Sequence, residues 1–400
     1  MATASFRKVP LKASVVAAAL CVAGAAHAQS SVTLYGIADA GLMYQTHTAP
    51  AAPGGPTPHQ FSLTNAGYSP SLFGMMGTED LGGGLKATFK LESGIDLSNG
   101  GFDNPGGGHG LFNRTADVGL SSDRFGTLLA GLQISPFFDT VYELDPRSAA
   151  EFGSALTPNV DNAMIATIFM PNAVTYTSPN IAGFQVAGLF GLGGIAGNFQ
   201  AGRSWSVSGK YTNGTLLVGA AYISVNNGNM NTNGLLTNSG LAAVNSLLLA
   251  NVRAWTAGAS YKLDTVTVKA SFTNYKANSA PVPNFSTDTS VNMYTFGADW
   301  FALPYLDLNG AVYYQDDRVH SGSHSITAAI GTQFFLSKRT ALYAQVGLVN
   351  NKCSADGACL GSGLSVESGG SALGAMNGLG TLGFPAGTTV AGNVGVRVMF

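Results

Sequence analysis

Short segments with one-by-one alternation of apolar and polar residues run through most of this chain, and the connections between them are alternately short and long. The sequences LKATFKLE at 85–92 and VTVKASFT at 266–273 both have this form. A period of two residues indicates β-strands, because successive side chains leave opposite faces of a strand. Strict alternation of short and long connections is typical of membrane barrels, which carry turns at one rim and loops at the other. The pattern therefore predicts an all-β fold, an antiparallel transmembrane β-barrel rather than a soluble β-sandwich.

The number of alternating segments supports a closed barrel. We count sixteen, and an even number places both chain termini at the same rim. The segments are 31–44, 71–79, 85–95, 113–121, 126–134, 173–178, 183–191, 203–211, 215–224, 253–262, 265–274, 293–301, 306–315, 325–336, 340–349 and 389–400. The short connections are rich in Gly and Asn, which tolerate the positive φ angles of tight hairpins.

The composition fits a sheet that faces hydrocarbon. Charged residues make up 10% of the chain, against roughly 25% in an ordinary soluble domain. In the last segment, Val394, Val396 and Val398 share one face, whereas Asn393 and Arg397 lie on the other. Apolar side chains facing lipid and polar ones facing a water-filled interior would produce this arrangement. We therefore expect contact with outer-membrane lipid, and the composition offers no basic patch for nucleic acid.

The first 28 residues have the form of a secretory signal peptide. A basic head with Arg7, Lys8 and Lys12 precedes an apolar stretch at 13–24 and a small-residue cleavage sequence, AHA, at 26–28. We expect residues 1–28 to be removed and residues 29–400 to form one barrel domain. Removal deletes three of 19 Lys+Arg and none of 21 Asp+Glu, so the formal charge becomes 16 − 21 = −5.

Two cysteines remain after the signal peptide. Cys353 and Cys359 are separated by five residues in a glycine-rich connection. Exported proteins reside in an oxidising compartment, so we expect a local disulfide between them. A metal site is the alternative, but two further ligands are not evident. We therefore expect no metal and no cofactor.

The connection at 135–172, the third long one, is the candidate constriction. A sixteen-stranded barrel is too wide for its wall side chains to fill. A long loop with apolar anchors such as Phe137 and Phe152 is expected to fold inward rather than extend into solvent. The charged residues of this loop that we expect at the constriction are Asp139, Glu143, Asp145, Arg147 and Glu151.

Four charged residues on the neighbouring wall are further candidates for the lumen. Lys86, Lys90 and Glu92 alternate along one face of the segment 85–95, and Arg114 begins the next segment. Inward residues of such barrels are polar by default. We interpret the first three as solvated lumen residues rather than as a dedicated solute site. Arg114 is the stronger functional candidate.

Several motifs resemble those of the general porins of Gram-negative bacteria. They are QSSVTLYG at 29–36, GTEDLGGGLKA at 77–87, FNR at 112–114 with VGLS at 118–121, NAVTYTSP at 172–179, LSKRT at 336–340, YA at 343–344 and the terminal Phe400. The resemblance implies a homotrimer of sixteen-stranded barrels in the outer membrane, which lets small hydrophilic solutes and ions diffuse passively past a constricting third loop. It also implies that Phe400 belongs to a signal read by the barrel-assembly machinery.

Departures from the family pattern predict an unusual channel. Basic residues that the resemblance leads us to expect on the wall are replaced by Leu72, Met76, Leu132 and Met170, whereas Arg114 is retained. Acidic residues of the third loop would then dominate the local potential, which acts over roughly 8–10 Å at ordinary salt. We expect a narrow region that is less basic and more apolar than in relatives, and a channel that is less anion-selective or even cation-preferring.

Two other functions are compatible with an outer-membrane barrel. An outer-membrane enzyme would need a nucleophile and a His held by a third group, and no such context surrounds the histidines, so we expect no enzyme. A structural or adhesin-type barrel with little conductance remains an alternative. The connections at 225–252 and 350–388 are long and rich in Gly, Asn, Ser and Leu, and exposed loops often carry secondary roles.

Overall fold

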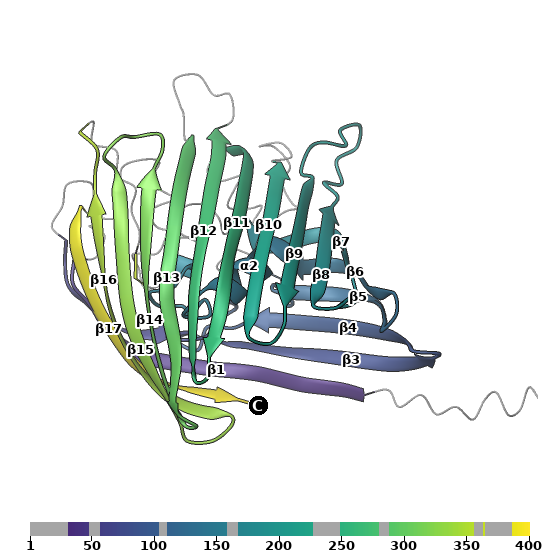
Figure 1. Ribbon diagram of the computed structural model, residues 1–400, viewed down its shortest axis with the longest axis horizontal. Coiled ribbons are helices and arrows are strands. Elements are labelled where there is room, and N and C mark those ends of the chain that lie inside the picture. Colours follow the sequence, from purple (N-terminus) through teal and green to yellow (C-terminus); the bar gives the residue numbers. More distant parts are fainter. Residues whose placement is uncertain are drawn as a thin grey trace, which may run out of the picture.

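The computed structural model describes residues 31–47, 57–103, 110–157, 167–226, 249–279, 288–355, 363–364 and 386–400. The predicted signal peptide at 1–28 lies outside these residues. Within them, the chain forms seventeen strands in one antiparallel sheet that closes into a barrel (Figure 1). The strands are β1 (Ser31–Gln45), β2 (Gln60–Asn65), β3 (Leu72–Gly82), β4 (Leu85–Gly94), β5 (Thr115–Ser122), β6 (Gly126–Ile134), β7 (Phe169–Thr177), β8 (Phe184–Gly191), β9 (Ser204–Thr212), β10 (Leu216–Asn226), β11 (Leu249–Leu263), β12 (Val266–Ser279), β13 (Thr289–Leu303), β14 (Leu306–Asp317), β15 (His324–Phe335), β16 (Thr340–Lys352) and β17 (Gly387–Met399).

The barrel closes where β1 pairs with β17. Ile37 lies opposite Met399, and the register continues to Gln45 opposite Ala391. On its other side, β1 pairs with β3 at residues 31–37 and with the short β2 at residues 40–45. β2 and β3 thus occupy one position in the wall, and the predicted sixteen-stranded barrel is confirmed. β2 itself lies in a connection for which no strand was expected.

The alternation of faces follows the predicted pattern on β17. Val394 is 55% exposed on the outer face, whereas Asn393 is 2% exposed on the inner face. Aromatic rings form a row on the outer face near the rim with long connections, with centroid distances of 4.8 Å for Trp205–Tyr222 and 4.9 Å for Trp255–Phe272. Such rows mark membrane interfaces in barrels. No helix among the described residues is long and apolar enough to span a membrane.

The third long connection folds into the barrel, as predicted. Its helix α2 (Pro136–Leu144) begins at Ser135, whose side chain accepts a hydrogen bond from the Phe138 N–H at 3.1 Å. Pro at the first helical position suits this start, because its missing N–H would have no partner there. Phe137, Val141 and Leu144 form the buried face of α2, which lies against the inner side of β9, β10 and β11 (Figure 1).

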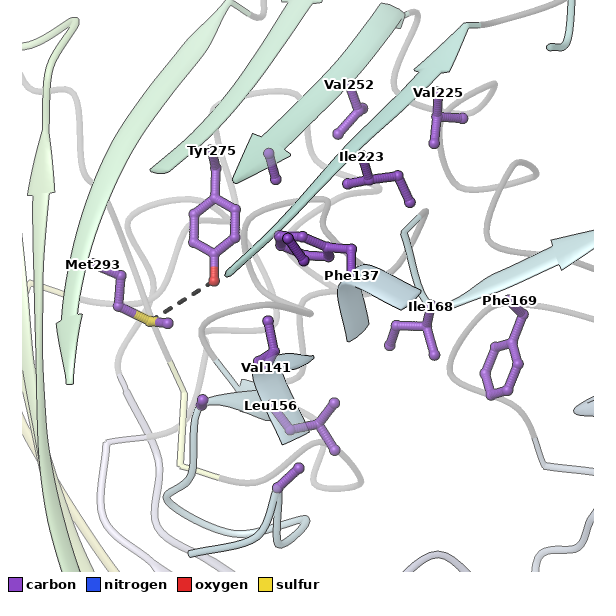
Figure 2. Packing of buried hydrophobic residues seen from close by; sticks show 14 of the residues in the cluster. Phe137, Val141, Leu156, Ile168, Phe169, Ile223, Val225, Val252, Tyr275 and Met293 are labelled. Carbon is purple, nitrogen blue, oxygen red and sulfur yellow. Dashed lines mark hydrogen bonds between the residues drawn. The ribbon is translucent and has the colours of Figure 1, made fainter. Parts of the chain in front are cut away.

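This loop and the wall enclose a hydrophobic core inside the barrel. Figure 2 shows Phe137, Val141, Leu156 and Ile168 of the loop surrounded by side chains from the neighbouring strands. The wall contributes inward-facing apolar residues, among them Ile223, Val225, Val252, Tyr275, Val291 and Met293. The inner face near the loop rim of β10–β13 is therefore apolar, in contrast to the polar inner face expected from the sequence. Burial against the loop explains the difference, because these side chains do not meet channel water.

Candidate functional site

Glu92 is only 5% exposed, so it is not the solvated lumen residue expected from the sequence, and its carboxylate is bound by three donors on the wall. Its carboxylate accepts hydrogen bonds from Arg114 Nε and from the Tyr35 hydroxyl, each at 2.9 Å, and lies 3.1 Å from Lys90 Nζ. The Arg114 guanidinium also lies 5.3 Å from the centre of the Phe169 ring. Arg114 is thus engaged by a carboxylate and an aromatic face, whereas the Lys90 side chain keeps 38% of its surface exposed. Lys90 is the more accessible of these two cations.

Lys86 lies further along the same face of β4, toward the rim with short turns. Its Nζ is 4.0 Å from Asp123 Oδ1 in the β5–β6 turn, and both side chains are well exposed. An ion pair this exposed contributes little to stability. Lys86 therefore adds positive charge near that rim rather than a fixed contact.

Two predicted acids lie on the exposed side of α2. Asp139 is exposed, and Glu143, one turn later, lies 2.5 Å from Lys210 Nζ of β9. A cavity of about 80 Å³ separates this side of the helix from β8 and β9, and both acids and Lys210 line it. The helix thus presents one free carboxylate and one ion pair to the interior of the barrel.

Asp145 anchors the loop instead of lining the passage. It is almost completely buried and accepts hydrogen bonds from the Tyr313 hydroxyl at 2.7 Å and the Ala149 N–H at 2.6 Å. Lys269 donates to the backbone carbonyl of Asp145 at 2.8 Å. Burial raises the pKa of the Asp145 carboxyl, and the bonds from Tyr313 and Ala149 oppose that rise. This placement differs from the constriction role expected for Asp145.

Arg147 is likewise buried, with 1% exposure. Its Nη2 donates to the Phe152 carbonyl at 3.2 Å and to Gln345 Oε1 on β16. Gly331 on β15 leaves room for the guanidinium, because a Cβ there would lie 3.1 Å from both Nη1 and Nη2. Arg147 therefore fastens the loop to the wall and does not face the passage as expected.

Glu151 is the third loop residue placed differently from the sequence expectation. Its exposure is 3%, and its N–H donates to the Tyr68 carbonyl at 3.0 Å. Its Oε2 has no hydrogen-bond partner within the described part of the chain. Burial raises the pKa of Glu151 to about 8, an effect that the nearby Arg114 charge partly opposes. Glu151 thus cannot act as an open, water-exposed acid of the constriction.

The four apolar residues at expected basic positions differ in placement. Met76 is 46% exposed and lies opposite Lys90 in the β3–β4 register, on the face that carries Lys90. Leu72 is only 5% exposed. Met170 is fully buried in the core under the loop, and Leu132 is half-buried against it. Among these four, Met76 alone presents a largely open side chain to the interior.

Some residues at the site were not predicted from the sequence. Asp39 of β1 is buried and accepts hydrogen bonds from the Gly67 and Ser69 N–H groups and from the Tyr343 hydroxyl. These bonds hold the break between β2 and β3. Lys210, which pairs with Glu143, was also missed. Its inward position could be inferred from alternation, but its partner on the loop could not.

Phe400 and Cys353 are the two remaining residues for which the sequence predicts a role. Phe400 exchanges two backbone hydrogen bonds of 3.1 Å with Gly36 and so extends the closure of the barrel. Cys353 is disulfide-bonded, but Cys359 lies outside the described residues, so their pairing remains a prediction. The described residues contain no group of three or more His, Cys, Asp or Glu side chains that could hold a metal ion.

Comparisons with known proteins agree with this architecture. The model of the Gram-negative porin family matches residues 13–354. An outer membrane porin protein of Bordetella pertussis is 30% identical over 380 residues, covering 85% of this chain and 95% of that protein. Outer membrane porin protein 32 of Delftia acidovorans is 30% identical over 361 residues, covering 86% and 90%. The solved anion-selective porin from Comamonas acidovorans has a TM-score of 0.70 and 26% identity, covering 93% of this chain and all of that one.

Proposed function

Because this chain belongs to the family of Gram-negative porins and is an outer-membrane β-barrel for passive diffusion, we propose that its channel combines weak ion selectivity with a partly apolar constriction. The family members are channels rather than enzymes. The proposal concerns the charge of the narrow region and the solutes that pass it, which we take to be small hydrophilic molecules and ions.

The observation that carries the proposal is the state of the wall cations. Arg114 is bound by Glu92 at 2.9 Å, and Lys90 lies near the same carboxylate. Met76 occupies the open position beside Lys90. The wall cluster therefore brings two cations and one carboxylate, and the neighbouring residue offers a thioether surface instead of a further charge.

The loop side supports the same conclusion. Asp139 is exposed on α2, and the Glu143 charge is matched by Lys210. Positive and negative groups thus face each other without a large excess of either sign. The related porin from Comamonas acidovorans is anion-selective. We propose that the present channel prefers anions less strongly than that relative.

Planar-bilayer recording of the purified, unboiled protein tests this proposal. Conductance is followed by the reversal potential across a potassium chloride gradient. A reversal potential close to zero, or on the cation side, is expected. Strong anion preference would contradict the account of the wall and leave the channel function intact. Absence of conductance would favour the structural or adhesin-type barrel instead.

We further propose a homotrimer in which β16, β17 and β1 contribute to the contact between subunits. The exposed side chains of these strands are mainly aliphatic, such as Leu34, Leu342, Val346 and Val394, whereas large aromatic rings line the outer face of β9–β14. A flat aliphatic face suits packing against another barrel. Conductance that closes in three equal steps, together with the mass of the detergent-solubilised particle, tests this assembly.

We also propose a role for Phe400 in delivery of the protein to the outer membrane. Phe400 ends the strand that closes the barrel, and we propose that this strand is the segment recognised by the barrel-assembly machinery. Removal of Phe400 should lower the amount of folded protein in the outer membrane at unchanged synthesis. Normal membrane levels of the shortened chain would contradict this role.

A further inference from the structure

The cavity of about 80 Å³ beside α2 forms a recess in the side of the lumen. One of its sides is the helix, which contributes Asp139 and Glu143, and the other is the inner face of β8 and β9. The wall contributes two pairs of residues that lie opposite each other in the β8–β9 register, Gln185 with Lys210 and Ala187 with Ser208. We call this cavity the helix recess. Because Gln185 is the second residue of β8, the recess lies toward the rim with short turns.

The helix recess is rich in hydrogen-bond acceptors. Asp139 forms no ion pair within the described part of the chain. Gln185 donates its Nε2 to the Ser178 carbonyl at 3.2 Å, which leaves its Oε1 as an acceptor. The charge of Lys210 is matched by Glu143 at 2.5 Å. The lining of the recess therefore has one unmatched negative charge.

Charge and size together suit the helix recess to a small organic cation. One water needs about 10–15 Å³ of such a cavity, so the recess has room for a group the size of several waters. A guanidinium group is planar, and its forked N–H donors match the two oxygens of a carboxylate. It is also more weakly hydrated than an ammonium group. Entry into a partly enclosed site therefore costs a guanidinium less than it costs an ammonium.

The surroundings of Asp139 make this site sensitive to pH. The side chain reaches water along the recess, but it lies between the helix and the wall. This enclosure and the charge of Glu143 raise the pKa of the Asp139 carboxyl to about 6, whereas the charges of Lys210 and Lys90 oppose the rise. Asp139 is therefore charged at neutral pH and neutral in mildly acidic solution.

We propose that the helix recess binds the guanidinium group of small solutes as they pass through the channel. Asp139 accepts two N–H groups as a fork, and Gln185 Oε1 and the Ser208 hydroxyl accept others. The rest of the solute stays in the lumen. This inference rests on the proposed channel function and names a class of solute for it.

Block of the potassium chloride current by methylguanidinium, measured in planar bilayers at pH 7.5, tests the proposal. A solute held beside the narrow region should lower the wild-type current saturably as its concentration rises. Asp139→Asn should raise the half-blocking concentration about tenfold, because a charge-assisted hydrogen bond is replaced by a neutral one. At pH 5 the wild type should lose most of its block, whereas the weak block of Asp139→Asn should not change with pH.

Ala187→Leu distinguishes the helix recess from the general charge of the lumen. The larger side chain would fill the recess while Asp139 keeps its charge, so the block should weaken as it does in Asp139→Asn. Heat-modifiable migration on gels shows whether each variant is folded. Wild-type block in either folded variant would overturn the proposal.

The matched charge control is Asp123→Asn, which removes one acid from a turn where its side chain is 88% exposed. It should be blocked like the wild type, and a loss of block equal to that of Asp139→Asn would overturn the site. Tetramethylammonium, which has no N–H donor, should give no saturable block. Equal block by tetramethylammonium and methylguanidinium would also overturn the site, since charge alone would then explain the effect.

The reversal potential across a potassium chloride gradient, measured before methylguanidinium is added, tests the channel proposal separately. Strong anion preference together with saturable block would contradict the account of the wall and support the helix recess. Weak selectivity without block would support the account of the wall and overturn the recess.

Discussion

The Tyr313 hydroxyl donates a hydrogen bond of 2.7 Å to Oδ1 of Asp145. The two residues are 168 positions apart in sequence, and both are buried. The bond joins the end of α2 to the inner face of β14. Together with Lys269 and Arg147, it fixes where the third loop lies in the barrel.

Substitution of Tyr313 by Phe should weaken this attachment. The ring keeps its packing, but Asp145 loses a donor in a buried site. The free energy of unfolding should fall by about 1–3 kcal/mol, the range for a hydrogen bond to a buried or charged group. Urea unfolding of the barrel in lipid vesicles measures this change in the free energy of unfolding. Tyr142→Phe is the control, because Tyr142 is exposed on the same loop. Equal losses in both variants would show that the hydrogen bond contributes nothing specific.

Gly331→Val should displace the guanidinium of Arg147 from its position against β15. A Cβ at Gly331 would lie 3.1 Å from Nη1 and Nη2 of Arg147, and the two methyl groups of valine would add to the crowding. We expect a larger and noisier single-channel conductance, because the loop loses its attachment near β16. Gly188→Val provides a comparison, since a Cβ at Gly188 meets no heavy atom within 4 Å. Quiet, wild-type conductance in Gly331→Val would argue against Arg147 as an anchor.

Arginine introduced at Met76 and at Leu72 should have different effects. Met76 is open to the interior, so Met76→Arg should shift the reversal potential toward anion preference while the barrel still assembles. Leu72 is 5% exposed, and an unpaired buried charge there should cost several kcal/mol and reduce folded protein. Reversal potentials and the yield of heat-modifiable protein on gels distinguish the two. A folded Leu72→Arg channel with strong anion preference would contradict the placement of Leu72.

The Glu151 carboxyl should make stability depend on pH. Its pKa in the folded protein is about 8, raised by burial from an ordinary value of 4.5. Between these values the folded state holds a proton that the unfolded state has released, so stability falls as pH rises through this window. Glu151→Gln should remove that part of the slope. Unfolding free energies of both proteins from pH 4 to pH 9 test this, and parallel curves would exclude Glu151 as the titrating group.

The wall of the barrel could be predicted from the sequence because one local rule governs it. From alternation and turn residues, the sixteen predicted segments lie close to the observed bounds of the wall strands. β2 was missed because it is a six-residue strand inside a long connection, held in place by the distant Asp39. Its signal is a tertiary contact rather than a local pattern.

The interior was harder to predict for the same reason. Asp139 and Glu143 lie on the side of α2 that faces the interior of the barrel, where they were expected, whereas Asp145, Arg147 and Glu151 are buried as attachments of the loop. Sequence composition shows that the loop is acidic, but it does not show which carboxylates meet water. Likewise, Ile223 and Val252 are apolar on the inner face because Phe137 of the loop covers them, and the sequence pattern of β10 and β11 does not reveal this contact.

The core between the third loop and the wall also constrains the order of assembly. Phe137 and Val141 pack against buried residues of β10 to β14. Many tens of residues separate these strands from the loop in sequence. No surface exists for the loop to dock on until those strands are in register, and contacts of such separation form slowly. Docking of the loop is therefore a late event. A newly inserted barrel should pass through a stage in which its pore is wider than in the finished protein.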